Sequence, residues 1–327
     1  MAPKLLNRLI AGRRQTLADP FVAQFQFPVP GGWLNVARSG PTVGRADGVV
    51  LAVHGITASH VAWRTVARVL AVEGDVTVLS PDLRGRGRSG GVPGPFGISA
   101  HVADLVALLD REGVESAVLA GHSMGGYVAA RLAAEHPERV SSLVLIDGGL
   151  PIDVPADKDP AELLAAALGP AAERLDDWFA SRADYVAMWR AHPAFADAWN
   201  ADVEAYVNYD VESAEDRAHP NAVRSRVSSD AVWADGREIL LDEVTRTALD
   251  RVSAPVRLLR APRGILDDDR PLIPPKALAD FASVRPGASR ETVPGTNHYT
   301  ILLGPGAGPA RVAEAIHDAS SGAGLAR

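Results

Sequence analysis

Short, continuously apolar runs recur along this chain, and stretches with helical periodicity separate them. Residues 48–53 read GVVLAV, and similar runs return at residues 76–79, 117–120, 142–146 and 256–259. A strand that is buried on both faces needs such a run, whereas a half-exposed strand alternates. Helical patterns lie between the runs, at residues 62–72, 102–109 and 127–135. Strands alternating with helices of this length predict an α/β fold, in which helices flank a mostly parallel sheet.

The alternation stops after residue 149 and resumes after residue 250. The intervening sequence has helix-like stretches, no convincing strand, and half of the aromatic residues of the chain, between Trp178 and Trp233. We therefore predict three parts: a first core segment at 1–149, a helical cap at 150–250, and a second core segment at 251–327. We call residues 150–250 the cap segment, and we expect its aromatic side chains to form its core or to line a pocket against the sheet.

The composition excludes several kinds of site. The formal net charge is −7, so the clustered positive charge that nucleic acid requires is not expected. The chain has no cysteine, which excludes disulfides, thiolate metal sites and cysteine nucleophiles. No apolar run approaches the ~18 residues of a membrane span. Asn7 and Arg8 interrupt the apolar residues near the start, so we expect an amphipathic helix there instead of a signal peptide, and a cytoplasmic protein.

Residues 121–125 read GHSMG, directly after an apolar strand-like run and before a helical run. The spacing G-x-S-x-G is a weak signal alone, but between a strand and a helix it predicts a nucleophile elbow. The two glycines permit a sharp turn that lifts the Ser123 hydroxyl out of the carboxyl edge of the sheet. The backbone N–H of Met124 would then lie at a helix N-terminus, where it can stabilise a developing oxyanion.

His54, Gly55 and Ile56 follow the run at residues 48–53 and would end near the same edge of the sheet. Gly55 allows a tight turn there, so the backbone N–H of Ile56 is the candidate second oxyanion donor. We expect His54 itself to be structural, as a buried imidazole held by hydrogen bonds.

Four motifs, in this order, resemble the α/β-hydrolase family over nearly the whole chain. They are HGITASHVAW (54–63), PDLRGRGRSG (81–90), GHSMGG (121–126) and PGTNHYT (294–300). The resemblance implies the α/β-hydrolase fold with a helical cap insertion, and a catalytic triad in the chain order serine, acid, histidine. In this setting we expect the arginines of residues 84–88 to lie in a solvated loop or in one tethered by Asp82.

A serine hydroxyl needs an adjacent base, and His298 is the best candidate because a strand-like run precedes its loop. His122 adjoins Ser123 in sequence, and we expect it to point away from the site. The acid has two possible positions, and we assign it to Asp147, with Asp267 or Asp268 as the alternative. Asp147 ends the run at residues 142–146, a placement found in some members of the family, whereas Asp267 and Asp268 follow the next run and come later than the usual position.

These residues predict a cofactor-independent serine hydrolase that acts on a small-molecule substrate. It would cleave an ester, thioester or lactone of a small to medium, moderately apolar compound through an acyl-enzyme. Carbon–carbon bond hydrolysis, aminopeptidase-like hydrolysis and perhydrolysis are alternatives on the same fold. A receptor-like protein that binds a ligand with little turnover is the alternative from another class. No metal or nucleotide motif is present, and the oligomeric state is not predicted.

Overall fold

A computed structural model describes residues 18–73, 76–155, 157–168, 174–213 and 221–321, so the expected N-terminal helix lies almost wholly outside the described residues. Its centre is an eight-stranded sheet of order β1-β2-β4-β3-β5-β6-β9-β10. The first two strands are antiparallel to each other and β2 is antiparallel to β4, whereas the other neighbours pair in parallel. The predicted α/β fold with a mostly parallel sheet is therefore confirmed. The strands are β1 (Phe21–Val29), β2 (Gly32–Ser39), β3 (Gly48–Val53), β4 (Val76–Pro81), β5 (Ala117–His122), β6 (Val140–Ile146), β9 (Val256–Arg260) and β10 (Ser289–Thr292).

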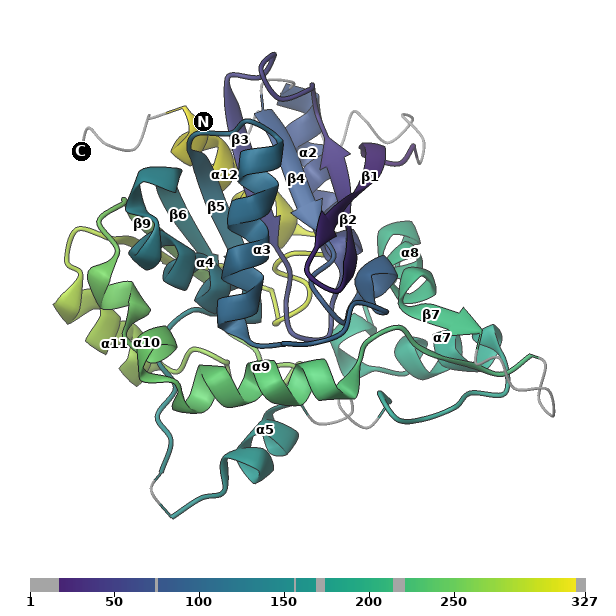
Figure 1. Ribbon diagram of the computed structural model, residues 1–327. Coiled ribbons are helices and arrows are strands. Elements are labelled where there is room, and N and C mark those ends of the chain that lie inside the picture. Colours follow the sequence, from purple (N-terminus) through teal and green to yellow (C-terminus); the bar gives the residue numbers. More distant parts are fainter. Residues whose placement is uncertain (1–17, 74–75, 156, 169–173, 214–220, 322–327) are drawn as a thin grey trace.

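Helices cover both faces of the sheet (Figure 1). Successive residues of β3 show why: Leu51 and Val53 enter one core cluster, whereas Val50 and Ala52 enter the other. A parallel strand that is buried on both sides has this pattern. The first cluster also contains apolar residues of α3 and α4, and the second contains those of α2 and α12. These helices and the one after β9 are α2 (Arg64–Glu73), α3 (Ile98–Arg111), α4 (Met124–Glu135), α11 (Pro275–Val284) and α12 (Ala307–Ser320).

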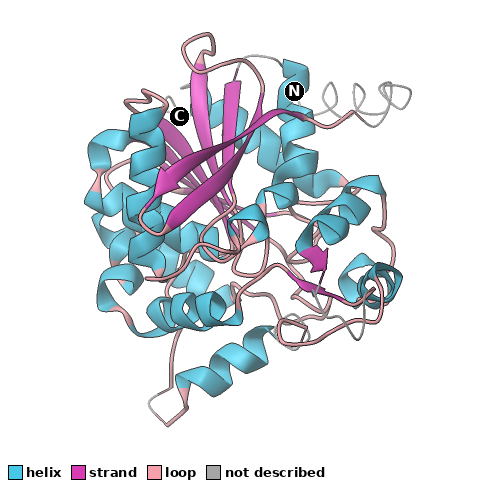
Figure 2. Ribbon diagram, turned by 45° about the vertical axis from the view of Figure 1, so that its right-hand side comes forward, coloured by secondary structure: helices cyan, strands magenta, loops and turns pink. Residues whose placement is uncertain are grey.

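The chain between β6 and β9 lies beyond the carboxyl ends of the parallel strands, below the sheet in Figure 1. Its helices are α5 (Pro160–Leu168), α7 (Arg182–Arg190), α8 (Ala201–Asp210), α9 (Ser229–Leu241) and α10 (Glu243–Arg246). The prediction that this segment has no strand is wrong. β7 (Val211–Ser213) pairs antiparallel with β8 (Val223–Ser225), seen in Figure 2. Strands of three residues are too short for a sequence pattern to reveal them.

The aromatic residues of the cap segment divide between its core and its surface. Tyr185, Trp189 and Phe195 are buried, and the rings of Trp189 and Phe195 meet edge to face. Trp178 and Trp233 are exposed. The expectation of an aromatic core is therefore confirmed for the buried three.

The carboxyl ends of β3, β5 and β6 lie side by side, since β5 pairs with both neighbours. Gly121 of β5 is opposite Val53, and His122 is opposite Ile146. The residues that follow these strands must therefore meet at one edge of the sheet. No helix within the described ranges is long and apolar enough to cross a membrane.

Candidate active site

Ser123 occupies a strained turn between β5 and α4. Its φ of 55° and ψ of −122° lie outside the regions that ordinary residues adopt, which costs on the order of 1–3 kcal/mol. Glycine is required on both sides of Ser123, because any larger side chain would collide with the backbone. A Cβ on Gly121 would lie 2.2 Å from the carbonyl oxygen of Gly125, and a Cβ on Gly125 would lie 2.1 Å from that of Val53. The predicted strand–turn–helix at this motif is present.

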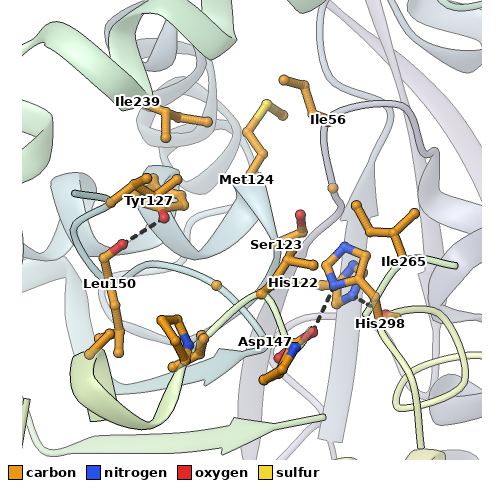
Figure 3. Close-up of a pocket in the computed structure, with 18 of the residues that line it drawn as sticks. Ile56, His122, Ser123, Met124, Tyr127, Asp147, Leu150, Ile239, Ile265 and His298 are labelled. Carbon is orange, nitrogen blue, oxygen red and sulfur yellow. Dashed lines mark hydrogen bonds and ion pairs between the residues drawn. The ribbon is translucent and has the colours of Figure 1, made fainter. Parts of the chain in front are cut away.

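His298 and Asp147 form a buried pair beside Ser123 (Figure 3). His298 Nδ1 lies 2.8 Å from Asp147 Oδ2, while Asp147 Oδ1 accepts a hydrogen bond of 3.0 Å from the backbone N–H of Ala261. A carboxylate only accepts, so Nδ1 carries the proton and Nε2 is left to face the serine. Among the described contacts no hydrogen bond joins His298 to the Ser123 hydroxyl, but both residues line one cavity. Catalytic hydrogen bonds often shorten only when substrate binds.

The second predicted position for the acid is separate from this pair. Asp267 accepts from Asn297 Nδ2 at 3.1 Å and from Arg263 Nε at 2.9 Å. Asp268 pairs with Arg270 on the surface. Of the two positions that the sequence leaves open, the structure brings only Asp147 into hydrogen bonding with His298 within the described residues.

The chain at Gly55 lies directly against the nucleophile. A Cβ on Gly55 would lie 3.2 Å from Ser123 Cβ and 3.6 Å from its Oγ. Met124 is the first residue of α4 and so carries one of the N–H groups that a helix leaves without an internal partner. Within the part of the chain described, neither the Ile56 N–H nor the Met124 N–H donates to a backbone carbonyl. Both are therefore available to an oxyanion.

His54 is structural, as expected. Its Nε2 accepts a hydrogen bond of 3.0 Å from the backbone N–H of Leu83, and its Nδ1 lies 2.8 Å from the carbonyl oxygen of Gly55. Because an accepting Nε2 must be unprotonated, Nδ1 is the donor. Complete burial lowers the pKa of His54 to about 3, so the ring is neutral at physiological pH.

His122 does not point away from the site, contrary to expectation. Its ring lies 4.7 Å from that of His298, between centroids, and its Nε2 donates to the carbonyl oxygen of His298 at 2.9 Å. Burial, and then the neighbouring His298, hold the pKa of His122 well below its usual range. Adjacency to Ser123 was the only signal in the sequence, and it does not reveal where the ring packs.

Of the two alternatives expected for the arginine loop, tethering by Asp82 is confirmed. Asp82 does tether it, since Asp82 Oδ2 accepts from the backbone N–H of Arg88 at 3.0 Å. Arg84 and Arg86, however, are 3% and 0% exposed. Each is buried because a carboxylate distant in sequence pairs with it, Asp104 and Asp235 respectively.

A cavity of about 720 Å³ opens above Ser123, within the range of 300–1,000 Å³ typical of small-molecule sites. Most of its wall is apolar. In Figure 3, Tyr127, Leu150 and Ile239 lie on the other side of Ser123 from His298. Further apolar residues of this wall are Leu163, Leu164, Leu240, Leu249, Ile273 and Phe281. The described residues contain no group of three or more acidic or histidine side chains able to hold a metal ion.

Comparison with known proteins gives consistent results. A family model described as "alpha/beta hydrolase fold" matches residues 48–305. Lipase LipV of Mycobacterium tuberculosis is 36% identical over 146 residues, 44% of this chain and 53% of the relative. Epoxide hydrolase 2 of Siraitia grosvenorii is 37% identical over 97 residues, 29% of this chain and 30% of the relative. The match thus spans about half or less of these curated relatives.

Solved structures resemble nearly the whole chain. The crystal structure of E-2-(acetamidomethylene)succinate hydrolase superimposes with a TM-score of 0.70 at 21% identity, and covers 90% of this chain and 98% of that one. At this identity the likeness shows the fold.

Proposed function

Because the chain belongs to the alpha/beta hydrolase family, we propose that it is a serine hydrolase that cleaves an ester, thioester or lactone through an acyl-enzyme. One observation carries the proposal: the 2.8 Å pair of His298 and Asp147 lies in the wall of the cavity onto which Ser123 opens. The residues around this pair supply a nucleophile, a base, a group that orients the base and two oxyanion donors.

In the first half-reaction, Ser123 Oγ attacks the substrate carbonyl while His298 Nε2 takes its proton. The backbone N–H groups of Ile56 and Met124 stabilise the oxyanion of the tetrahedral intermediate. Asp147 holds the Nδ1–H tautomer of His298 and stabilises the imidazolium that forms. When the intermediate collapses, the bond to the alcohol or thiol breaks, and His298 gives its proton to that leaving group.

In the second half-reaction, water attacks the acyl-enzyme and His298 Nε2 takes a proton from it. A second tetrahedral intermediate forms in the same oxyanion hole. Its collapse releases the carboxylic acid and returns the proton to Ser123 Oγ. The triad and the oxyanion hole thereby regain their starting state.

The lining of the cavity supports a small to medium, moderately apolar substrate. Leu150 and Ile239 offer apolar surface on the side of Ser123 away from His298. Burial of apolar area is worth about 25 cal/mol per Å². An acyl group on this side would leave the alcohol near His298, which must protonate it. We also propose that the cap segment, residues 150–250, acts as the lid of this cavity.

A fluorophosphonate probe tests the proposal directly. The intact mass of the wild-type protein should increase by one phosphonyl adduct, and Ser123→Ala should gain none. A panel of p-nitrophenyl esters graded by chain length, with several lactones, should then give turnover that His298→Ala lowers by about 10⁴–10⁶-fold. Absence of both adduct and turnover would favour the receptor-like alternative.

A further inference from the structure

The loop that carries the Ile56 N–H is held by buried side chains at three successive carbonyl groups. His54 Nδ1 donates to the carbonyl oxygen of Gly55 at 2.8 Å. Arg86 Nε donates to that of Ile56 at 3.0 Å, and Arg174 Nη2 donates to that of Thr57 at 3.1 Å. The triad does not use any of these three donors. Both guanidinium groups are almost fully buried.

These contacts determine where the Ile56 N–H points. The carbonyl of Gly55 and the N–H of Ile56 belong to one planar peptide unit, so a donor that holds the carbonyl also aims the N–H. The carbonyl of Ile56 belongs to the next unit, which Arg86 holds. Ile56 is therefore fixed from both sides, with a charged donor on one of them. Hydrogen bonds from a charged donor are about twice as strong as neutral ones.

Arg86 is in turn held by the cap segment. Its Nη1 lies 2.5 Å from Asp235 Oδ2, a residue of α9, and both side chains are fully buried. The other ligands of Asp235 come from the core: the backbone N–H of Gly97 at 2.7 Å and His101 Nε2 at 2.9 Å. Burial alone would raise the pKa of Asp235, but Arg86 and His101 hold it at about 2. The carboxylate of Asp235 therefore stays ionised and retains its ion pair with Arg86.

Arg174, which belongs to the cap segment, likewise joins a carbonyl of this loop to a carboxylate of the cap segment. Its Nη2 lies 3.3 Å from Asp210, the last residue of α8. Two cap carboxylates thus act on two successive carbonyls of the oxyanion loop, each through one arginine.

We propose that Arg86 is a positioning residue of the oxyanion hole, through which Asp235 of α9 couples the seating of the cap segment to the orientation of the Ile56 N–H. The inference rests on the proposed function, since it assigns a role in stabilising the oxyanion of that reaction. When α9 is seated, Arg86 fixes the loop. When the contact between Asp235 and Arg86 is lost, the loop relaxes and the donor is misaligned.

The same loop supplies a matched control. Arg84 pairs with Asp104 through Nε at 2.5 Å and Nη2 at 2.8 Å, and it is as buried as Arg86. Its Nη1 donates to the carbonyl oxygens of Pro30 and Pro93, which are not part of the oxyanion loop. Breaking this pair disturbs a buried arginine and carboxylate without touching Ile56.

The experiment compares Arg86→Lys with Arg84→Lys. Lysine keeps the charge but cannot reach the carboxylate and the Ile56 carbonyl together, because it lacks the rigid fork of arginine. We expect Arg86→Lys to lower kcat by about 10–100-fold on the p-nitrophenyl ester that the wild type cleaves best, with little change in KM. The loss is moderate because the Ile56 N–H is still present and is only misaligned. Arg84→Lys should retain kcat within about threefold, even where both variants lose similar thermal stability.

A second readout reports on the oxyanion hole alone. An alkyl trifluoromethyl ketone adds to the serine as a hemiketal whose oxyanion occupies that hole, so Arg86→Lys should weaken its inhibition by the same factor as kcat. Equal losses of kcat in the two lysine variants, or a loss of kcat without weaker ketone inhibition, would overturn the proposal. If Arg86→Lys does not fold, Asp235→Asn against Asp104→Asn gives the same comparison. If wild type shows neither turnover nor phosphonylation at Ser123, the proposed function has failed instead.

Discussion

The carboxylate of Asp147 meets the imidazole of His298 at 2.8 Å, although 151 positions of chain separate them. The sheet produces this meeting. Asp147 directly follows β6, and its backbone N–H donates to the carbonyl of Leu259 in the adjacent β9 at 2.8 Å. The loop after β10, the next strand of the sheet, carries His298 back over that edge. A φ of 46° at Asp147 turns the chain there.

Asp147→Asn is therefore expected to lower kcat by about 10⁴-fold, because an amide at this position favours the wrong tautomer of the base. Asp267→Asn should keep kcat within about threefold, since the amide retains an oxygen to accept from Asn297. Steady-state kinetics on one p-nitrophenyl ester compare the two. Full kcat in Asp147→Asn would assign the acid elsewhere.

Gly55→Ala tests the spacing of the oxyanion loop. The added methyl group would stand 3.2 Å from Ser123 Cβ and 3.4 Å from His122 Nδ1. The loop must move away from Ser123 to accommodate the methyl group, and the Ile56 N–H moves with it. We therefore expect kcat to fall by about 100-fold while the protein stays folded. Gly91→Ala is the control, since no atom lies within 4 Å of its added methyl group. The two variants should differ in kcat and hardly in melting temperature, and equal kcat would contradict the assignment of Ile56.

The positions of Ser123 and His298 could be predicted because local sequence determines them. The elbow needs glycines on both sides of the serine, and the strand before it is a continuous apolar run. The acid could be assigned to Asp147 only as a preference between two positions. Asp147 and Asp267 both follow strands, and the choice between them depends on which carboxylate the tertiary fold brings to His298.

The roles of His122 and Arg86 were missed for the same reason. Each depends on a contact between segments far apart in the chain: His122 with the backbone of His298, and Arg86 with Asp235 of α9. From sequence alone, a charged residue in a loop is predicted to be exposed to solvent, because the buried partner that would pair with it is not known. The short strands β7 and β8 leave no pattern either, because their pairing is tertiary.

Ile239→Trp should shorten the apolar side of the cavity. Ile239 lines the cavity from α9, whereas Leu241, two residues on, is 45% exposed. We expect Ile239→Trp to lower kcat/KM for long-chain p-nitrophenyl esters by about 10–100-fold, and to leave the acetate ester nearly unchanged. Leu241→Trp adds the same side chain to the same helix and should leave the whole chain-length profile in place. A profile unaltered by Ile239→Trp would place the acyl group elsewhere.

The stability of the fold should decrease in mild acid. The pKa of His54 is about 3 in the folded protein against 6.5 when unperturbed, so between these values the unfolded chain binds a proton that the folded chain does not. The free energy of unfolding therefore falls as the pH falls, by about 1.4 kcal/mol per pH unit for this residue. Burial also lowers the pKa of His192, to about 4, and adds to the slope.

The buried carboxylate of Asp235 does not produce this slope. The pKa of Asp235 lies below the unperturbed value of 3.8, so its contribution to stability is lost only as the pH falls below about 4. Urea unfolding at pH 7.5, 6 and 5 measures the histidine window separately. His54→Gln should reduce the pH dependence of the free energy of unfolding. A free energy of unfolding that is constant from pH 7.5 to 5 in the wild type would refute the prediction.

His122 should matter for catalysis through the backbone of His298. Its Nε2–H donates to the His298 carbonyl, and its Nδ1 is buried without a partner among the described residues. His122→Leu preserves much of the volume but leaves that carbonyl unsatisfied, a loss of about 1–3 kcal/mol. Part of this loss should appear as displacement of the base, and we expect kcat to fall by about 10-fold with KM unchanged.

His122→Gln separates the hydrogen bond from the packing. The amide nitrogen of glutamine can reach the same carbonyl, so this variant should regain most of the activity that leucine loses. The rate of fluorophosphonate labelling at Ser123 should follow kcat in both variants, because labelling needs the same base. If glutamine and leucine reduce the labelling rate equally, the ring of His122 supports His298 by its shape alone, and the hydrogen bond plays no part in placing the base.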